Sequence, residues 1–266
     1  MPSDVPAVGA AMRILEALAA ASPAAVSPGQ LVSDLKLNRS TCYNILAALQ
    51  RGGWARSLGD RAGWTLGPRL LALASGTTDL VMAMMQQELD RLSAELGFVV
   101  FVAERGSAGD HVVVAKAERQ SGVRVTVGIG DTFPFSAPAL MQAACAWLPR
   151  NERDQLIAKH GLIAFTHRTV VEPKSLHELL DSVRDRGFSS SLHQFNLAQG
   201  GVAAPVFDHR GVVQRIVCTL AFSSELNEDN ADEVGAAARA CADRITARIG
   251  GSPPDAAADD AEEQAG

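Results

Sequence analysis

A short run of side chains near the N-terminus is suited to binding nucleic acid. It contains Arg39, Ser40, Thr41, Tyr43 and Asn44. An asparagine amide can read adenine, threonine and tyrosine can contact thymine methyls or phosphates, and arginine can reach guanine or the backbone. Arginine is the only charged residue type in the run, whereas a helix face that only needs solvation more often carries Glu and Lys. These residues therefore predict a surface that meets a polar, negatively charged partner.

The elements around this run have the pattern of a helix-turn-helix. Asn38 is a good N-cap for a helix over 39–51, and the glycines at 52–53 are suited to end it. An earlier helix is predicted to begin at 27–30, with Ser27 as its cap and Pro28 at its first position. Because the connection between the two helices is short, the second helix is expected to present its polar face to the major groove. Its buried stripe is Cys42, Ile45, Leu46 and Leu49.

A hairpin is predicted directly after these helices. Residues 54–58 and 64–66 can pair as strands around a loop at 59–63 that holds two glycines. Three helices followed by such a hairpin make a winged helix-turn-helix. Arg56 and Arg61 on the wing can reach phosphates or the minor groove. The predicted DNA contacts are Arg39, Ser40, Thr41, Tyr43, Asn44, Arg51, Arg56 and Arg61.

The charge of the chain is unevenly distributed. The net charge is −6, which by itself argues against nucleic acid. Residues 1–75, however, carry seven Lys or Arg and four Asp or Glu, a local charge of +3. The remaining residues carry a charge of −9. The basic character therefore belongs to the N-terminal part, where the DNA contacts are predicted.

The length of 266 residues leaves room for two domains in a chain of the α+β class. A first helix is predicted to stop before Ser22, with its inner face formed by Val8, Ala11, Met12, Leu15 and Leu18. The predicted divisions are a disordered stretch over 1–7, a winged helix-turn-helix domain over 8–67, a linker helix over 68–78, a second domain over 79–250 and a disordered acidic tail over 251–266.

The second domain is predicted to mix strands and helices. After helices at 68–75 and from 78 to 96, strands are expected at 98–103, 111–118 and 123–127. A loop at 128–136 leads to helices at 139–148, 151–160 and 173–186, the second of them capped by Asn151. Strands at 202–207 and 212–222 precede a last helix from 227.

Several function classes are excluded by what the sequence lacks. There is no G-x-S-x-G, no H-E-x-x-H and no glycine-rich phosphate loop, and Cys145 with His160 is a poor nucleophile pair because Cys145 stands in an apolar helix. No cofactor is expected, and the histidines at 160, 167 and 193 lack metal-ligand spacing. The four cysteines are read as buried thiols. No apolar run is long enough for a membrane helix and no signal peptide is evident, so a cytoplasmic protein is expected.

A pocket for a small molecule is predicted in the second domain. Such a pocket needs an apolar concavity with a few converging polar groups. The loop at 128–136 offers backbone N–H groups and Ser136, and the following helix can lie beneath it. The strand at 218–219 and the loop at 193–201 can close it. The candidate effector-binding residues are Gly128, Ser136, Ala137, Met141, His193, Asn196, Gly201, Val202, Cys218 and Thr219.

Three segments carry a resemblance to a known family. The segments 37–46 (LNRSTCYNIL), 64–69 (WTLGPR) and 201–207 (GVAAPVF) resemble the IclR family of bacterial transcriptional regulators. The resemblance covers about 8–250, nearly the whole chain. It implies an N-terminal DNA-binding domain, a linker helix and a GAF-like α/β domain that binds a small effector. It also implies dimers or tetramers, and effectors that are often small organic acids.

The chain departs from the family pattern in the second domain. It has Met141 and Gln142 where Gly-Lys is common, and His193 and Gln194 where an acidic pair is usual. It has Gly201 where a cysteine often stands. These changes remove one lysine and two carboxylates, and so alter the electrostatics of the expected pocket. The polar groups that remain can still hold a carboxylate or an amide.

The sequence therefore predicts a ligand-responsive DNA-binding regulator, a repressor of a nearby metabolic operon that binds a pseudo-palindromic operator as a homodimer or homotetramer. Two alternatives stay open. One is a metabolic enzyme with a fused helical domain, which catalytic motifs would have revealed. The other is a GAF-like sensor or interaction module whose winged domain binds protein instead of DNA.

Overall fold

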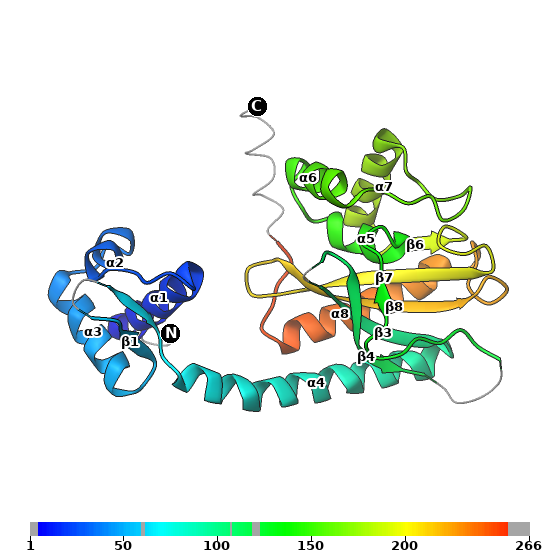
Figure 1. The fold of residues 1–266 in the computed structure, drawn as a ribbon. Helices are drawn as coiled ribbons and strands as arrows, with labels where there is room; N and C mark the ends of the chain where they lie inside the picture. The colour runs from blue at the N-terminus through cyan, green and yellow to red at the C-terminus, as the bar shows by residue number, and fades with distance from the viewer. Residues whose placement is uncertain (1–4, 60–61, 107, 119–122, 255–266) are drawn as a thin grey trace. The chain divides into compact units, whose positions relative to one another are not determined.

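The computed structural model describes residues 5–59, 62–106, 108–118 and 123–254. These residues form two compact units, Met1–Leu80 and Val81–Gly266. The elements of both units are labelled in Figure 1. The mixture of helices and antiparallel strands confirms the α+β class.

The first unit holds three helices and a small hairpin. Its elements are α1 (Pro6–Ala21), α2 (Pro28–Asp34), α3 (Arg39–Arg51), β1 (Ala55–Ser57) and β2 (Trp64–Leu66), with the two strands paired antiparallel. The two predicted caps are present, since Ser27 Oγ accepts a bond from the Gln30 N–H at 3.2 Å and Asn38 Oδ1 accepts one from the Ser40 N–H at 3.0 Å. These caps satisfy N–H groups that the first turn of each helix leaves unpaired.

Helix α1 buries a different face from the one predicted. Its buried residues are Ala10, Ile14 and Leu18, whereas Val8 and Met12 are 57% and 59% exposed. The alanine-rich helix carries two apolar stripes, and hydrophobic periodicity alone cannot choose between them. The helix also begins at Pro6, inside the stretch predicted to be disordered.

One long helix, α4 (Arg69–Leu96), replaces the two helices predicted on either side of residues 76–78. A glycine inside a helix costs only about 1 kcal/mol relative to alanine, which is not enough to break a long helix by itself. The helix runs through the boundary between the two units. It is therefore the covalent connection between them.

The second unit is built on a six-stranded antiparallel sheet in the order β5-β4-β3-β8-β7-β6. Its strands are β3 (Val99–Arg105), β4 (His111–Ala117), β5 (Thr132–Phe133), β6 (Ser189–Leu192), β7 (Gln199–Phe207) and β8 (Val213–Phe222). Its further helices are α5 (Pro138–Cys145), α6 (Arg150–His160), α7 (Pro173–Arg186) and α8 (Ala231–Arg248).

Each face of this sheet packs against helices (Figure 1). On one face, Val100 and Val102 of β3 pack with residues of α8 and of the C-terminal part of α4. On the other face, Phe101 and Ala103 pack with Ala139 of α5. The alternation follows from the two-residue period of a strand, which sends successive side chains to opposite faces.

Several predicted bounds in this unit are wrong. The strand predicted at 123–127 is absent, and Val123 is 89% exposed. Thr126 and Arg124 instead donate bonds to the Glu118 carboxylate, which ties this segment through side chains. Strands β5 and β6 fall where none was predicted, and α6 begins at Arg150 behind Pro149, so Asn151 is not its cap. Residues 251–252 of the predicted tail are hydrogen-bonded to the carbonyls of Thr246 and Asp208.

Candidate functional site

The outer face of α3 is a continuous exposed polar surface. Arg39, Ser40, Thr41, Tyr43 and Asn44 are all exposed, as is Arg51 at the end of the helix. The Arg39 guanidinium lies over the Tyr43 ring, 5.9 Å from its centroid. This stacking restricts both side chains while leaving the N–H groups of the guanidinium at the surface.

The inner face of α3 fixes the direction in which this polar surface points. Cys42, Ile45 and Leu46 are buried in one core with Ile14 and Leu18 of α1. Burial of each of the larger side chains, Ile45 and Leu46, stabilises the folded unit by about 1.5–3 kcal/mol. The helix therefore cannot turn about its axis without exposing the apolar stripe. The Ser40 hydroxyl also donates to Asn38 Oδ1 at 3.0 Å, so it belongs in part to the cap.

One of the two arginines predicted to contact DNA from the wing lies in the described part of the hairpin. Arg56 lies in β1, opposite Thr65 in β2, and its side chain is exposed. The loop after β1 is shaped by Ser57, whose Oγ accepts a bond from the Gly59 N–H at 3.2 Å. Arg61 lies outside the described residues. The described part of the hairpin thus presents one guanidinium that can meet a phosphate.

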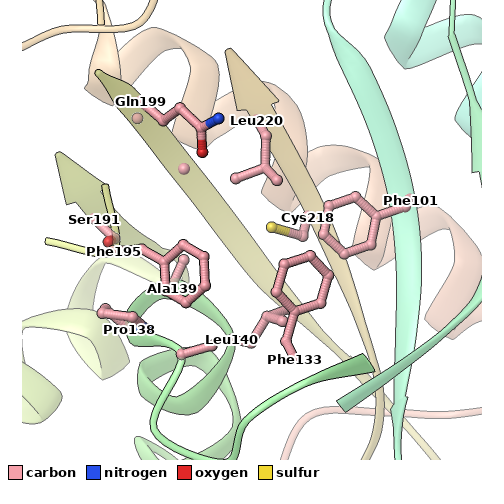
Figure 2. Close-up of a pocket in the computed structure, with 13 residues that line it drawn as sticks. Phe101, Phe133, Pro138, Ala139, Leu140, Ser191, Phe195, Gln199, Cys218 and Leu220 are labelled. Atoms are coloured by element: carbon pink, nitrogen blue, oxygen red, sulfur yellow. The ribbon is translucent and has the colours of Figure 1, made fainter. Parts of the chain in front are cut away.

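The second unit contains an apolar cavity on the face of the sheet that carries α5. Its empty volume is about 380 Å³, including space open to solvent at its mouth. Figure 2 shows side chains of β3, β8, α5 and the β6–β7 loop gathered around it. The cavity is lined by Phe101, Phe133, Ala137, Pro138, Ala139, Leu140, Ser191, Phe195, Gln199, Gly200, Gly201, Cys218 and Leu220.

Aromatic rings form a chain from the interior to the surface at this cavity. The Phe101 and Phe133 rings are stacked with centroids 5.7 Å apart, and Phe133 meets Phe195 edge-on at 6.0 Å. Phe195 also packs on Phe165, with centroids 4.7 Å apart. Phe101 is fully buried, whereas Phe195 is 36% exposed. One end of the aromatic chain is therefore core and the other is accessible.

The loop that carries Phe195 is held by hydrogen bonds at both ends. His193 has a left-handed backbone with φ of 61°, and its Nδ1 lies 2.7 Å from the Leu197 carbonyl oxygen. The Thr166 hydroxyl donates to the His193 carbonyl at 2.7 Å, and the Thr169 hydroxyl donates to the Gln194 carbonyl at 2.6 Å. A left-handed backbone is unfavourable for a residue with a side chain, so these contacts are needed to hold the loop in place.

The structure brings three of the predicted effector residues to the cavity. Ala137, Gly201 and Cys218 line it. Gly201 matters for its lack of a side chain, because an added Cβ would come within 2.9 Å of Leu220 Cδ2 and narrow the space. His193 and Asn196 lie in the β6–β7 loop but do not line the cavity. There the Asn196 Oδ1 accepts a bond from the Ala198 N–H.

The other predicted effector residues do not line this cavity. Met141 packs in a separate core around α7. Val202 belongs to the core on the opposite face of the sheet. The Thr219 hydroxyl donates a hydrogen bond to the Val99 carbonyl. Ser136 is buried without lining the cavity, and Gly128 donates its N–H to Asp131 Oδ2 at 2.6 Å.

The prediction missed most of the cavity wall. Phe101 and Leu220 lie on the cavity side of their strands, and Phe133 and Phe195 stand in segments that were read as loops. The available signal is the aromatic residues within these two segments, Phe133 and Phe135 in 128–136 and Phe195 in 193–201. Large apolar residues in such loops often mark a surface that packs on the core or on a ligand.

A second, wider hollow adjoins the cavity. It has an empty volume of about 920 Å³, including open solvent, and is lined by residues 125–127 and 130–132 together with four side chains shared with the cavity. The shared residues are Phe133, Phe195, Gln199 and Leu220. These shared walls make the wider hollow an entrance to the cavity.

The cysteines of both units are buried thiols. All four cysteines, Cys42, Cys145, Cys218 and Cys241, are free and buried, as predicted. Burial raises the pKa of the Cys145 thiol to about 11 and that of the Cys241 thiol to about 12, which disfavours the nucleophilic thiolate. Within the described residues, no cluster of three metal-ligating side chains occurs and no helix has the length and apolarity to cross a bilayer.

The chain is similar over its length to known bacterial regulators. The family model of the IclR helix-turn-helix domain matches residues 7–59, and that of the bacterial transcriptional regulator IclR C-terminal domain matches residues 75–247. The transcriptional repressor IclR of Escherichia coli (strain K12) is 26% identical over 244 residues, covering 90% of this chain and 88% of that protein. The glycerol operon regulatory protein of Streptomyces coelicolor is 28% identical over 237 residues, covering 83% of this chain and 87% of that protein.

Solved structures support the same fold. An IclR transcriptional regulator from Alicyclobacillus acidocaldarius has a TM-score of 0.60 at 24% identity, over 93% of this chain and 100% of that one. The repressor BlcR of Agobacterium tumefaciens has a TM-score of 0.58 at 22% identity, over 93% of this chain and 98% of that one. The two family models together match most of the sequence. The chain belongs to the IclR family of bacterial transcriptional regulators.

Proposed function

We propose that this regulator is a repressor that binds an operator through α3 and is controlled by a small organic effector bound in its C-terminal unit. The observation that carries the proposal is the exposed polar face of α3, which is the second helix of a helix-turn-helix and is fixed by a buried stripe. Asn44, Thr41 and Arg39 are the residues assigned to the base edges. The family membership supports the same use of this domain.

The operator is proposed to be a pseudo-palindrome read by two copies of the chain. The sequence up to residue 75 carries a net charge of only +3, so one copy can neutralise few phosphates. Two copies of α3 can add their contacts when the half-sites lie about one helical turn apart, roughly 34–36 Å. Tight binding is therefore expected from a dimer or a tetramer, acting in the cytoplasm.

We propose that effector binding in the second unit is coupled to DNA binding through α4. Residues 68–78 of this region are the proposed linker, and α4 continues into the second unit, where Met85, Leu89 and Leu92 are buried in its core. An effector that changes the second unit can therefore change the separation of the two DNA-binding units in a dimer. Relatives named as the acetate operon repressor and the glycerol operon regulatory protein support a metabolic operon as the target.

A gel-shift experiment with the full chain and the DNA upstream of its own gene tests this function. The expected result is a discrete shift at about 100 nM protein at low salt, removed by excess unlabelled upstream DNA and not by excess scrambled DNA. The absence of any shift under these conditions would contradict DNA binding. It would instead favour an interaction module whose winged domain binds protein.

A further inference from the structure

The cavity beside α5 is lined almost entirely by apolar residues. Apart from Ser191 and Gln199, the residues that line it carry apolar side chains or none, and among the described residues no charged side chain lines it. The Phe133 and Phe195 rings meet edge-on, and both line this space (Figure 2). A ligand that fills such a space gains by burying an apolar ring, and gains more if the ring stacks on the phenylalanines.

The electrostatics of the entrance disfavour an anion. The wider hollow contains the Asp131 side chain, whose Oδ2 accepts the Gly128 N–H. Two described cations close to it in sequence both pair with Glu118, since Lys116 Nζ lies 2.9 Å from Glu118 Oε1 and Arg124 Nε lies 3.5 Å from Glu118 Oε2. A carboxylate that entered the cavity would lose its hydration without meeting a described cation, and such a transfer is strongly unfavourable.

Two polar side chains remain for a neutral substituent. Ser191 lies in β6, and Gln199 at the start of β7 lines both the cavity and its entrance. An amide or hydroxyl group on the ligand can exchange hydrogen bonds with a glutamine amide, which both donates and accepts. Gly201 in β7 leaves room for the ring, because a Cβ there would come within 2.9 Å of Leu220 Cδ2, which lines the cavity.

We propose that the effector of this regulator is an uncharged aromatic molecule with a hydrogen-bonding substituent, such as an aromatic amide or a phenol. The ring packs against Phe133 where the cavity meets the wider hollow, and the substituent faces Gln199. Phe195, half-exposed on its loop between the cavity and the wider hollow, stands at the point of entry. This inference rests on the proposed effector function of the second unit and narrows it from organic molecules in general to neutral ones.

Ligand-observed NMR with the full chain tests the charge preference with a matched pair of probes, benzamide and benzoate. The two have the same ring and nearly the same shape, but only benzoate is an anion at pH 7. The expected result is that benzamide binds at least roughly tenfold more tightly than benzoate. Cyclohexanecarboxamide, which keeps the amide without the aromatic ring, is expected to bind roughly threefold or more weakly than benzamide.

A substitution that adds a cation tests whether the preference for benzamide over benzoate is electrostatic. Gln199→Lys places an ammonium group at the cavity, so the preference is expected to reverse in favour of benzoate. The matched control is Gln155→Lys, which makes the same change on an exposed position of α6 and is expected to leave the preference as it was. A variant that simply failed to fold would lose both probes and would not reverse their order.

The proposal is overturned if benzoate binds as tightly as benzamide, if neither probe binds, or if Gln199→Lys leaves the preference for benzamide unchanged. Equal binding of benzamide and cyclohexanecarboxamide would overturn its aromatic part. A gel shift on the same sample distinguishes failure of the neutral-effector proposal from failure of the proposed DNA-binding function. A chain that shifts its upstream DNA but prefers benzoate contradicts the neutral effector and leaves the proposed DNA-binding function intact.

Discussion

Two exposed side chains of the DNA-binding unit are expected to contribute differently to operator binding. Asn44 lies on the helix assigned to the major groove, where an amide can distinguish adenine from the other bases. Arg56 lies on the hairpin, where a guanidinium meets phosphates that are the same for every sequence. The first side chain therefore bears on specificity and the second on affinity.

The substitution Arg56→Gln is expected to weaken binding to every duplex by a similar factor. Removing one phosphate contact also reduces the dependence of the binding constant on salt, by about one unit in the slope of log K against log[salt]. Titrations with upstream and scrambled DNA at several salt concentrations measure both quantities. A loss confined to the upstream DNA would show instead that Arg56 reads bases.

His111 is a buried histidine of the second unit whose pKa is lowered by burial. It is fully buried, and its Nε2 lies 3.2 Å from the Phe135 carbonyl oxygen. Burial lowers the pKa of this imidazole to about 4, with a smaller contribution in the same direction from Arg105, while the Phe135 hydrogen bond and Asp110 oppose it. The neutral form is therefore the one that the fold accepts.

This lowered pKa predicts a loss of stability in mild acid. The unfolded chain takes up a proton near pH 6.5, whereas the folded chain does so only near pH 4, so stability is complete above pH 6.5 and falls as the pH drops toward 4. The expected contribution of His111 to this loss is on the order of 2 kcal/mol between pH 7.5 and pH 5. Urea unfolding of the protein and of His111→Gln at the two pH values measures it. The variant is expected to lose less stability than the parent protein. A similar loss in both would show that His111 does not cause the acid sensitivity.

At the scale of elements, the contact between α4 and α8 depends on one buried carboxylate. Glu88 of α4 is almost fully buried, and its two oxygens lie 2.6 Å from Arg244 Nε and 2.9 Å from Arg248 Nη2. Both arginines come from α8 and remain partly exposed. The carboxylate is thus satisfied by charge-assisted hydrogen bonds at both oxygens.

The substitution Glu88→Gln is expected to lower the free energy of unfolding of the second unit by about 1–3 kcal/mol, because it removes the charge that satisfies two guanidinium groups in a partly buried contact. The matched control is Glu178→Gln, which removes a carboxylate from an exposed pair with Lys174 at 4.0 Å. That change is expected to cost less than about 0.5 kcal/mol. Thermal or denaturant unfolding compares the two variants, and equal losses would mean that the α4–α8 ion pairs do not stabilise the unit.

The sequence predicted elements well where local signals agree. Helix α3 has a cap, a periodic apolar stripe and a terminal glycine pair, and its bounds of Arg39–Arg51 are those expected. The same local logic failed at residues 123–127, whose alternating pattern suggests a strand. Side-chain bonds to Glu118 hold that segment instead, and bonds between segments cannot be read from local periodicity.

The cavity was harder to predict than the fold, for a geometric reason. In a strand, a shift of one residue moves a side chain to the other face of the sheet. Cys218 faces the cavity and its neighbour Thr219 does not, and Gly201 and Val202 divide in the same way. Which residue of each pair faces α5 depends on the packing of both faces, and both faces here are apolar. Sequence reasoning therefore found the right strands and only some of the right residues.

At the scale of the whole molecule, the proposed regulation needs two units joined by one continuous element. Helix α4 meets this need, since its C-terminal part is packed into the core of the second unit and its N-terminal part follows the hairpin of the first. A ligand shifts such a system only by as much as it prefers one of its states. The cavity beside α5 lies on the sheet face opposite to α4, so the proposed effector would act on α4 through the sheet.

The most direct test of the central claim is a fluorescence-anisotropy titration of the full chain with its upstream DNA and with a scrambled duplex. The parent protein is expected to prefer the upstream DNA by a factor of roughly 1,000 or more. Asn44→Ala is expected to lose roughly 5- to 150-fold on the upstream DNA and little on the scrambled duplex. Equal affinity of the parent protein for both duplexes, or an equal loss on both in the variant, would contradict the claim that α3 reads an operator.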